Sequence, residues 1–138
     1  MTTATPSFVL DSFALLALFR AEAGGPRVRQ LLEQADDGRI RLAMTVVNLG
    51  EVVYRTIREQ GIEGAEQAQA RIQQLAIAIV DVDRELALAA ARLKGAFGLG
   101  YADCFVAALA QRLGATLATG DSDFRKVEGV VTIEWLPT

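Results

Sequence analysis

The sequence contains no histidine and a single cysteine, Cys104, among its 138 residues. Without histidine, the Ser-His-Asp and Cys-His arrangements that activate a nucleophile are excluded, and so is the commonest protein ligand for zinc, copper and iron. One cysteine forms neither a disulfide within the chain nor a thiolate-rich zinc site. Any hydrolytic chemistry must therefore use carboxylates, which favour hard cations such as Mg²⁺ or Mn²⁺.

Long apolar runs are missing as well. No stretch of the chain exceeds ten residues without a charge, whereas a membrane-spanning helix needs roughly 18 or more apolar residues. The first ten residues have neither the basic start nor the long apolar segment of a signal peptide. We therefore expect a cytoplasmic protein that does not enter a membrane. Because 51% of the residues are hydrophobic, we expect one core and a single domain over residues 1–138.

A surplus of basic residues is also absent, since the formal net charge is −3. The distribution of charge weakens the argument against a nucleic-acid partner. Without five candidate site acids, 12 acidic residues remain against 14 basic ones, and 12 of the basic residues are arginine. Arginine forms forked hydrogen bonds with phosphate. The composition is thus compatible with RNA binding but does not predict it. The five acids set aside are Asp11, Glu51, Asp103, Asp121 and Asp123.

Strand-like apolar segments alternate with helical patterns along the chain. We expect strands at 7–10, 40–43, 76–80, 115–118 and 130–135. We expect helices at 13–19, 26 to about 38, 46 to about 60, 62–75, 85–94 and 101–113. Glycine follows several of these segments, as is usual where a helix ends. The alternation predicts a three-layer α/β domain with a mostly parallel central sheet.

Asp11 and Asp121 both lie where a predicted strand gives way to a turn. In open parallel sheets, ligands bind outside the carboxyl ends of the strands, near the point where the strand order reverses. Two carboxylates from distant parts of the sequence are therefore expected to meet at one edge of the sheet.

Two of the candidate acids have ordinary structural interpretations. Asp11 is suited to cap the helix that follows it, although Ser12 could take that role and free Asp11 for other work. Glu51 lies on a polar helix face with Asn48 and Arg55, where most glutamates are simply solvated. Asn48, one turn before Glu51, could also orient it. Both interpretations stay open at this point.

The remaining acids are equally ambiguous when each is taken alone. Asp103 lies in the first turn of its helix, where the helix dipole favours an anion. Asp121 and Asp123 belong to the segment TGDSDF, whose composition is typical of a turn, and we favour an ordinary turn for Asp123. The combination is more informative, because several carboxylates in apolar surroundings have no histidine or cysteine competing for the chemistry.

Four segments occur in a recognisable order, VLDSFALLALF, TVVNLGEVVYR, GLGYADCFVAALAQRLGA and LATGDSDF. Together they resemble PIN-domain proteins, and most of all VapC-type toxins of prokaryotic toxin–antitoxin systems. The resemblance covers nearly the whole chain and is weakest near residues 65–74. It implies an α/β/α sandwich and a Mg²⁺- or Mn²⁺-dependent endoribonuclease with RNA as its substrate. It also implies a small antitoxin protein as a partner and assembly as a homodimer.

The resemblance further assigns an acidic quartet that is both catalytic and metal-binding. In this sequence the quartet falls on Asp11, Glu51, Asp103 and Asp121. The three aspartates would be direct metal ligands, and Glu51 a ligand or the group that orients water. Further polar positions of the family match Ser12, Thr119 and Asp123. Phe13 departs from the small residue common at its position, which leaves the shape of the cleft open.

Four converging acids should repel one another, by roughly 4 kcal/mol for a pair about 4 Å apart at an effective dielectric near 20. We expect no lysine or arginine close enough to neutralise them. The main alternative function is a non-catalytic PIN-like module that binds RNA or protein. A site without catalytic function, however, has little reason to keep like charges together. A third possibility, a metal-dependent phosphatase for small substrates, would need a closed pocket.

Overall fold

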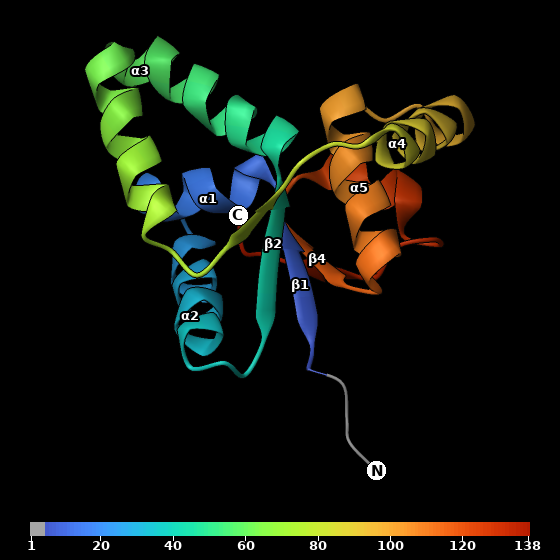
Figure 1. Ribbon diagram of the computed structural model, residues 1–138, viewed down its shortest axis with the longest axis horizontal. Coiled ribbons are helices and arrows are strands. Elements are labelled where there is room, and N and C mark those ends of the chain that lie inside the picture. The colour runs from blue at the N-terminus through green and yellow to red at the C-terminus, as the bar shows by residue number, and fades with distance from the viewer. Residues whose placement is uncertain (1–4) are drawn as a thin grey trace.

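The structure, a computed structural model, describes residues 5–138. Its centre is a five-stranded sheet in the order β3-β2-β1-β4-β5, in which every pairing is parallel. The chain builds the sheet from β1 through β2 to β3, and then places β4 and β5 on the other side of β1 (Figure 1). The strand order therefore reverses between β1 and β4. The strands are β1 (Ser7–Leu10), β2 (Arg41–Thr45), β3 (Ala78–Val80), β4 (Thr116–Thr119) and β5 (Ile133–Trp135).

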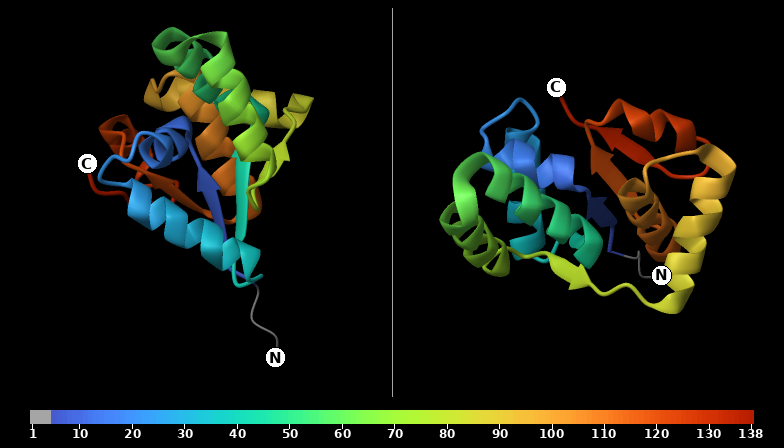
Figure 2. Two further views of the ribbon diagram at one scale, coloured as in Figure 1. Left: turned by 90° about the vertical axis from the view of Figure 1, so that its left-hand side faces the viewer. Right: turned by 90° about the horizontal axis from the view of Figure 1, so that it is seen from above.

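Helices cover both faces of this sheet, which gives the expected three layers (Figures 1 and 2). One face carries mainly α1 (Ser12–Phe19), α2 (Gly25–Asp36) and α3 (Val46–Gln73). The other face carries α4 (Arg84–Phe97), α5 (Tyr101–Leu113) and the short 3₁₀ helix η1 (Ser122–Val127). The predicted α/β class with a parallel central sheet is confirmed.

Alternate residues of the central strands enter two separate cores. Val9 of β1 and Leu117 of β4 pack with α4 and α5, whereas Leu10 and Ala118 pack with α1 and α2. This follows from strand geometry, since successive side chains point to opposite faces. A strand that is covered on both faces reads as a continuous apolar run, which is why the sequence shows these strands so clearly.

Several element boundaries differ from the sequence expectation. The break predicted at residue 61 is confirmed, because α3 has a kink at Gly61, whose φ of 79° lies in the left-handed region. Helix α4 continues to Phe97 and ends at left-handed Gly98, so the glycine-spaced loop predicted from residue 95 is short. Strands β3 and β5 are each three residues long, and η1 lies where only a turn was expected.

No single helix among residues 5–138 is long and apolar enough to cross a membrane. Helices α4 and α5 meet the requirements of length and composition only together, as a pair bent by 115°. The apolar residues of α5 from Cys104 to Ala110 are buried core residues.

Candidate metal centre

The carboxyl ends of β1 and β4 bring distant acids to one edge of the sheet. Asp11 directly follows β1, and Asp121 follows β4 after one intervening residue. Asp103 lies in the first turn of α5. These two strands are neighbours on either side of the point where the strand order reverses, which is where open parallel sheets place their ligands.

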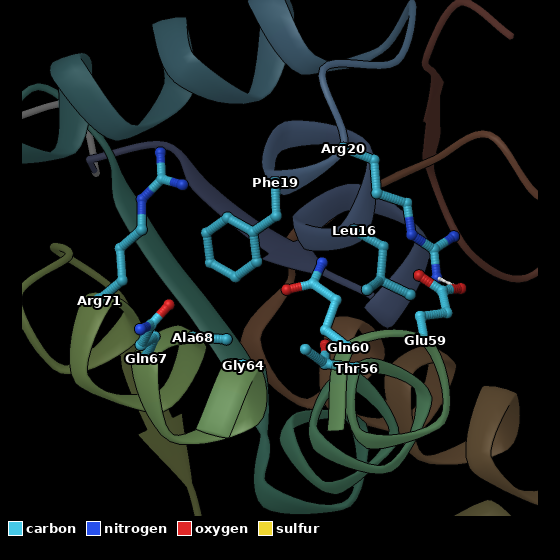
Figure 3. Close-up of a pocket in the computed structure, with 10 residues that line it drawn as sticks. All are labelled: Leu16, Phe19, Arg20, Thr56, Glu59, Gln60, Gly64, Gln67, Ala68 and Arg71. Atoms are coloured by element: carbon cyan, nitrogen blue, oxygen red, sulfur yellow. Dashed lines mark hydrogen bonds and ion pairs between the residues drawn. The ribbon is translucent and has the colours of Figure 1, made fainter. Parts of the chain in front are cut away.

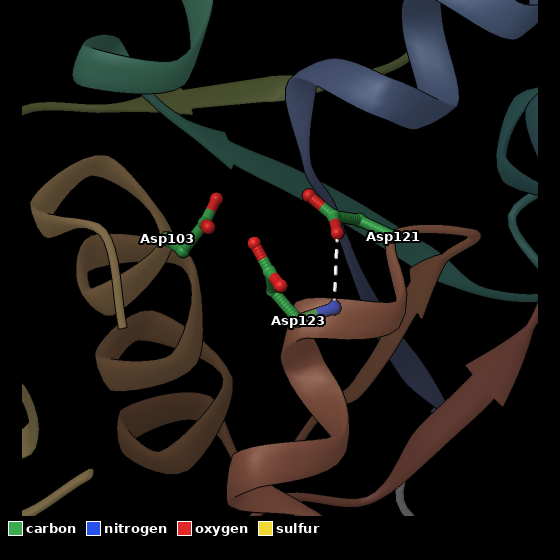
Figure 4. Close-up of side chains that lie close together, drawn as sticks. All are labelled: Asp103, Asp121 and Asp123. Carbon is green, nitrogen blue, oxygen red and sulfur yellow. Dashed lines mark hydrogen bonds between the residues drawn. The ribbon is translucent and has the colours of Figure 1, made fainter. Parts of the chain in front are cut away.

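Three of the acids form a tight cluster that opens to solvent. Asp103, Asp121 and Asp123 each offer one carboxylate oxygen, and these three atoms lie within 4.8 Å of one another. Figure 4 shows the three side chains converging from α5 and from the start of η1. Asp121 caps η1 by accepting a 3.0 Å hydrogen bond from the backbone N–H of Asp123. Asp123 is exposed, and the other two are half-buried.

The charge of this cluster affects the pKa of Asp103. This pKa is raised from 3.8 to about 6, first by burial and then by the charges of Asp121, Glu51 and Asp123, in that order. Arg55 acts in the opposite direction and lowers it. A carboxyl group in this position is partly protonated near neutral pH and gains from any added positive charge.

Asp11 forms the buried wall of the site and is only 3% exposed. Its Oδ1 accepts a 2.9 Å hydrogen bond from the backbone N–H of Ala14, and its Oδ2 accepts one of 2.5 Å from the Thr119 hydroxyl. Burial raises the pKa of Asp11 to about 7, although both hydrogen bonds lower it. The suggestion that Ser12 caps α1 in place of Asp11 is wrong, because Asp11 itself is the cap.

Thr119 connects Asp11 with the open cluster. Its hydroxyl donates to Asp11 and accepts a 3.0 Å hydrogen bond from the backbone N–H of Asp121. Thr119 is fully buried at the end of β4. One side chain therefore fixes the distance between the buried acid and the turn that carries Asp121.

Asn48 has the corresponding role for Glu51. It is fully buried, and its Nδ2 donates to Glu51 Oε1 at 3.0 Å and to the carbonyl of Ala102 at 3.2 Å. Its backbone N–H donates to the Thr45 hydroxyl, which caps α3 and also contacts the Asn48 side chain. Asn48 thus ties the first turn of α3 to the start of α5, and its predicted orienting contact with Glu51 is present.

The acids are not without a positive neighbour, contrary to the sequence expectation. Arg55 Nη2 lies 3.9 Å from Glu51 Oε2, and the side chain of Glu51 is only 11% exposed. The field of Arg55 also reaches Asp103, whose pKa it lowers. The sequence shows Glu51 and Arg55 one helical turn apart, but it does not show that α5 brings Asp103 beside them.

Phe13 and Gly120 shape the turn between Thr119 and Asp121. A Cβ atom at Gly120 would lie 2.6 Å from Cζ of the Phe13 ring, so the ring occupies the space that any larger residue would need. The large residue at position 13 is therefore accommodated by a glycine on the neighbouring segment. The Phe13 ring therefore lies beside the turn that carries Asp121.

A separate pocket of about 190 Å³ lies between α1 and the bent helix α3 (Figure 3). The guanidinium of Arg71 lies 4.7 Å from the centre of the Phe19 ring, and Arg20 forms an ion pair with Glu59. None of the candidate acids lines this pocket. It is therefore not part of the acidic site.

Comparison with protein families matches the PIN domain over residues 8–130. The chain belongs to the PIN domain family. The matched range includes all of the acids described above, from Asp11 to Asp123. A comparison with curated proteins gives no match.

Solved structures with the same fold are VapC toxins of VapBC toxin–antitoxin systems. VapBC2 from Rickettsia felis, solved with a DNA fragment from its promoter, has a TM-score of 0.75 and 16% identity, and the match covers 95% of this chain and 99% of that one. VapBC-1 from nontypeable Haemophilus influenzae gives 0.70 and 19%, with 94% and 97% covered. VapC20 from Mycobacterium tuberculosis, described as a toxin that cleaves the sarcin-ricin loop, gives 0.72 and 16%, with 94% and 99% covered.

The geometry divides the predicted site residues into groups. Asp103 and Asp121 are in the tight cluster, whereas Asp11 and Glu51 lie outside it. The charge of Glu51 raises the pKa of Asp103. The charges of Asp103 and Asp121 in turn raise the pKa of Asp11. Asp123 completes the cluster, although its sequence context favoured an ordinary turn. The spacing of two residues between Asp121 and Asp123 is the sequence feature that could have predicted its place, because Asp121 caps the 3₁₀ helix in which Asp123 lies. Ser12 is buried at the first position of α1, and its supporting role stays a prediction.

Proposed function

We propose that this protein is an endoribonuclease that depends on Mg²⁺ or Mn²⁺ and serves as the toxin of a toxin–antitoxin pair. The observation that carries the proposal is the convergence of Asp103, Asp121 and Asp123 within 4.8 Å at the carboxyl edge of a PIN-domain sheet. The proposed unit is one PIN domain over residues 1–138.

The residues present fit a hard divalent cation. All side chains of the cluster offer oxygen, which Mg²⁺ and Mn²⁺ prefer, and the pKa of Asp103 is raised by burial and by the charges of the neighbouring acids. Asp103, Asp121 and Asp123 would hold the cation. Asp11 also belongs to the proposed ligand set, since each of its oxygens keeps a lone pair after accepting one hydrogen bond. When bound, the cation lowers the pKa of water and stabilises charge on the phosphate.

The surrounding residues orient the groups that meet the substrate. Asn48 donates to Oε1 of Glu51, so that Oε2, which lies 3.9 Å from Arg55 and accepts no hydrogen bond from Asn48, is the atom left to orient or deprotonate the attacking water. Thr119 holds Asp11 and the backbone of Asp121 in a fixed relation. Arg55, with 45% of its side chain exposed, can receive the negative phosphate between the acids and solvent.

The toxin role is supported by the kind of structure that shares this fold. Proteins with similar folds include a toxin–antitoxin complex from Klebsiella pneumoniae and FitAcB from Neisseria gonorrhoeae. An antitoxin that covers the acidic opening and a homodimeric assembly are parts of the same proposal. Expression of this chain alone should slow growth, and an antitoxin encoded beside it should restore growth. Harmless expression of active protein would remove the toxin role but leave the nuclease.

The nuclease is tested by incubating purified protein with total RNA in Mg²⁺ and in EDTA, followed by mapping of the new ends. We expect discrete internal cuts only with the metal. Asp121→Asn, purified in the same way, controls for contaminating ribonuclease, and it should not cut. Equal cutting by both proteins, or cutting in EDTA, would refute the proposal. Turnover of small phosphate esters without RNA cleavage would favour the phosphatase, although the exposed position of Asp123 speaks against a closed pocket.

A further inference from the structure

The first turn of α5 carries Asp103, but no side chain caps the start of this helix. Figure 4 shows Asp103 projecting from α5 toward Asp121 and Asp123. The residue at the N-cap is Gly100, which has no side chain to accept a hydrogen bond from the free N–H groups of the first turn. We propose that Lys94, at the end of α4, is a positioning residue for Asp103, because its ammonium group holds the loop from which α5 begins. The inference rests on the proposed function, since it concerns how one ligand of that metal site is held.

Lys94 reaches the loop that joins α4 to α5. It lies in the last turn of α4, and its Nζ donates a 2.9 Å hydrogen bond to the backbone carbonyl of Leu99. The loop consists of Gly98, Leu99 and Gly100, and the side chain of Leu99 is fully buried in the core that α4 and α5 share. The one loop residue with a side chain is therefore fixed twice, by its burial in the core and by the ammonium group on its carbonyl.

The position of this loop bears directly on the carboxylate of Asp103. A Cβ atom at Gly100 would lie 3.6 Å from Oδ2 of Asp103, so this oxygen lies beside the loop backbone. The two glycines of the loop resist a change of conformation least among the amino acids. A shift of the Leu99 carbonyl would therefore pass through Gly100 into the turn that carries Asp103.

A second side chain holds the same stretch of backbone from another helix. Asn48 of α3 donates to the carbonyl of Ala102 at 3.2 Å, so the carbonyls at positions 99 and 102 are each bound by a side chain from outside α5. Among residues 5–138, Lys94 forms no ion pair, and the Leu99 carbonyl is the hydrogen-bond acceptor of its ammonium group. The charge of Lys94 is therefore used for this loop.

The far end of the same two helices is held by a comparable contact. Arg112, in the last turn of α5, donates at 2.8 Å to Asp83, the residue that caps α4. Arg112 follows Asp103 by nine residues, which is about 13.5 Å along the helix axis. Both contacts join a cationic donor to an oxygen atom across the α4–α5 pair, but only that of Lys94 lies beside Asp103. A comparison of the two therefore separates the placement of Asp103 from the general stability of the helices.

The test measures Mn²⁺ binding to the EDTA-treated and dialysed protein by isothermal titration calorimetry. Lys94→Met keeps the aliphatic stem but cannot donate, and it should weaken Mn²⁺ binding about three- to tenfold, the effect of one lost hydrogen bond. Loss of the positive charge alone has the opposite sign, because it would favour a cation at the acidic site. Lys94→Arg keeps a cationic donor and should restore most of the affinity. Arg112→Met, the matched control at the far end of the helices, should bind Mn²⁺ like wild type.

The outcomes separate this inference from the proposed function. If wild type binds Mn²⁺ and Lys94→Met binds it equally well or more tightly, the inference alone is overturned. Equal weakening in Lys94→Met and Arg112→Met would assign the effect to general stability and also overturn it, as would a Lys94→Arg variant that binds no better than Lys94→Met. If wild type does not bind Mn²⁺, the proposed function fails and the inference fails with it. Thermal melts in EDTA verify that all four proteins are folded at the temperature of the titration.

Discussion

The two walls of the acidic site differ in how firmly the fold holds their carboxylates. On the buried wall, Asp11 is 3% exposed, and both of its oxygens accept hydrogen bonds from within the protein. On the open wall, Asp103, Asp121 and Asp123 approach one another within 4.8 Å, and Asp123 is exposed. Burial is the largest cause of the raised pKa on both walls, but the effects that follow it differ.

At Asp11 the two hydrogen bonds oppose burial, and the charges of Asp103 and Asp121 add to it, whereas at Asp103 the charges of neighbouring acids are the next-largest cause after burial. Under the proposed function, the buried wall positions the site and contributes Asp11, and the open wall supplies the other ligands of the cation. Groups that hold a metal ligand in place matter alongside the ligand itself. Changes on the open wall should affect activity with little effect on the fold, and changes on the buried wall should affect stability as well as activity.

The largest effect is expected from Asp103→Asn. Loss of a supporting partner alone commonly costs 10- to 100-fold in metal affinity or activity, so removal of a ligand should reduce Mg²⁺-dependent RNA cleavage by more than about a hundredfold. The circular dichroism spectrum should not change, because Asn has the same shape and the side chain is half-buried. Cleavage at the wild-type rate would remove Asp103 from the site.

The second prediction concerns stability against pH in EDTA. The pKa values of Asp11 and Asp103 are raised from 3.8 to about 7 and about 6. Acids with raised folded-state pKa values stabilise the fold when protonated, and this stability is lost as pH rises through those values. The melting temperature should therefore fall between pH 5 and pH 8, by roughly 5 °C or more. The pKa values of Asp83 and Glu134 are lowered, so these two acids change the stability of the fold only in more acidic solution.

Mg²⁺ should reduce this fall, because it binds the ionised acids of the folded state only. Differential scanning calorimetry at several pH values measures both effects. A metal-free protein that is equally stable at pH 5 and pH 8 would contradict the raised pKa values.

A somewhat smaller effect is expected from Asp11→Asn on the buried wall. Asn can still cap α1 through Ala14 but carries no buried charge, so the EDTA-treated variant should melt about 3–5 °C above wild type at pH 8. The gain should shrink as pH falls below about 7 and vanish only below 3.8, where the carboxyl group of Asp11 is protonated in both the folded and the unfolded state. Mg²⁺ should stabilise wild type more than the variant. If Asp11 were only a helix cap, the change would be neutral or slightly destabilising at every pH and independent of metal.

The smallest predicted change is Gly120→Ala. The added Cβ would meet the Phe13 ring, and overpacking of this kind costs at least about 1 kcal/mol, so we expect the melting temperature to fall by roughly 3 °C. Phe13→Leu should relieve the clash in the double variant. A thermal-melt cycle of the two single variants and the double variant tests this, and additive effects would refute the proposed contact.

The sequence predicts the fold well because the central strands carry apolar side chains on both faces. The run Phe8-Val9-Leu10 and the segment Thr116–Thr119 have no other plausible structure between their helical neighbours. The ends of elements were harder to predict. Gly95 is compatible with the end of α4, but the helix continues to Gly98, where a left-handed conformation stops it.

The site could be predicted only in part. Strand ends identify Asp11 and Asp121, because local patterns fix where a strand stops. The place of Asp123 depends on the turn geometry of η1, and the proximity of Arg55 to Asp103 depends on the packing of α3 against α5. Neither is encoded in a local pattern. The two roles of Asp11, as helix cap and as a partner of Thr119, are compatible because a carboxylate has two oxygens.

The central claim is that these acids bind a divalent cation together. Isothermal titration of Mn²⁺ or Mg²⁺ into the EDTA-treated and dialysed protein tests it without any RNA. Asp36→Asn is the matched control, because Asp36 is an exposed acid at the end of α2, just before β2, and so at the opposite edge of the sheet. We predict saturable binding to wild type and to Asp36→Asn, and loss of that binding in Asp103→Asn. Binding that is equal in all three proteins, or absent from wild type, would contradict the account.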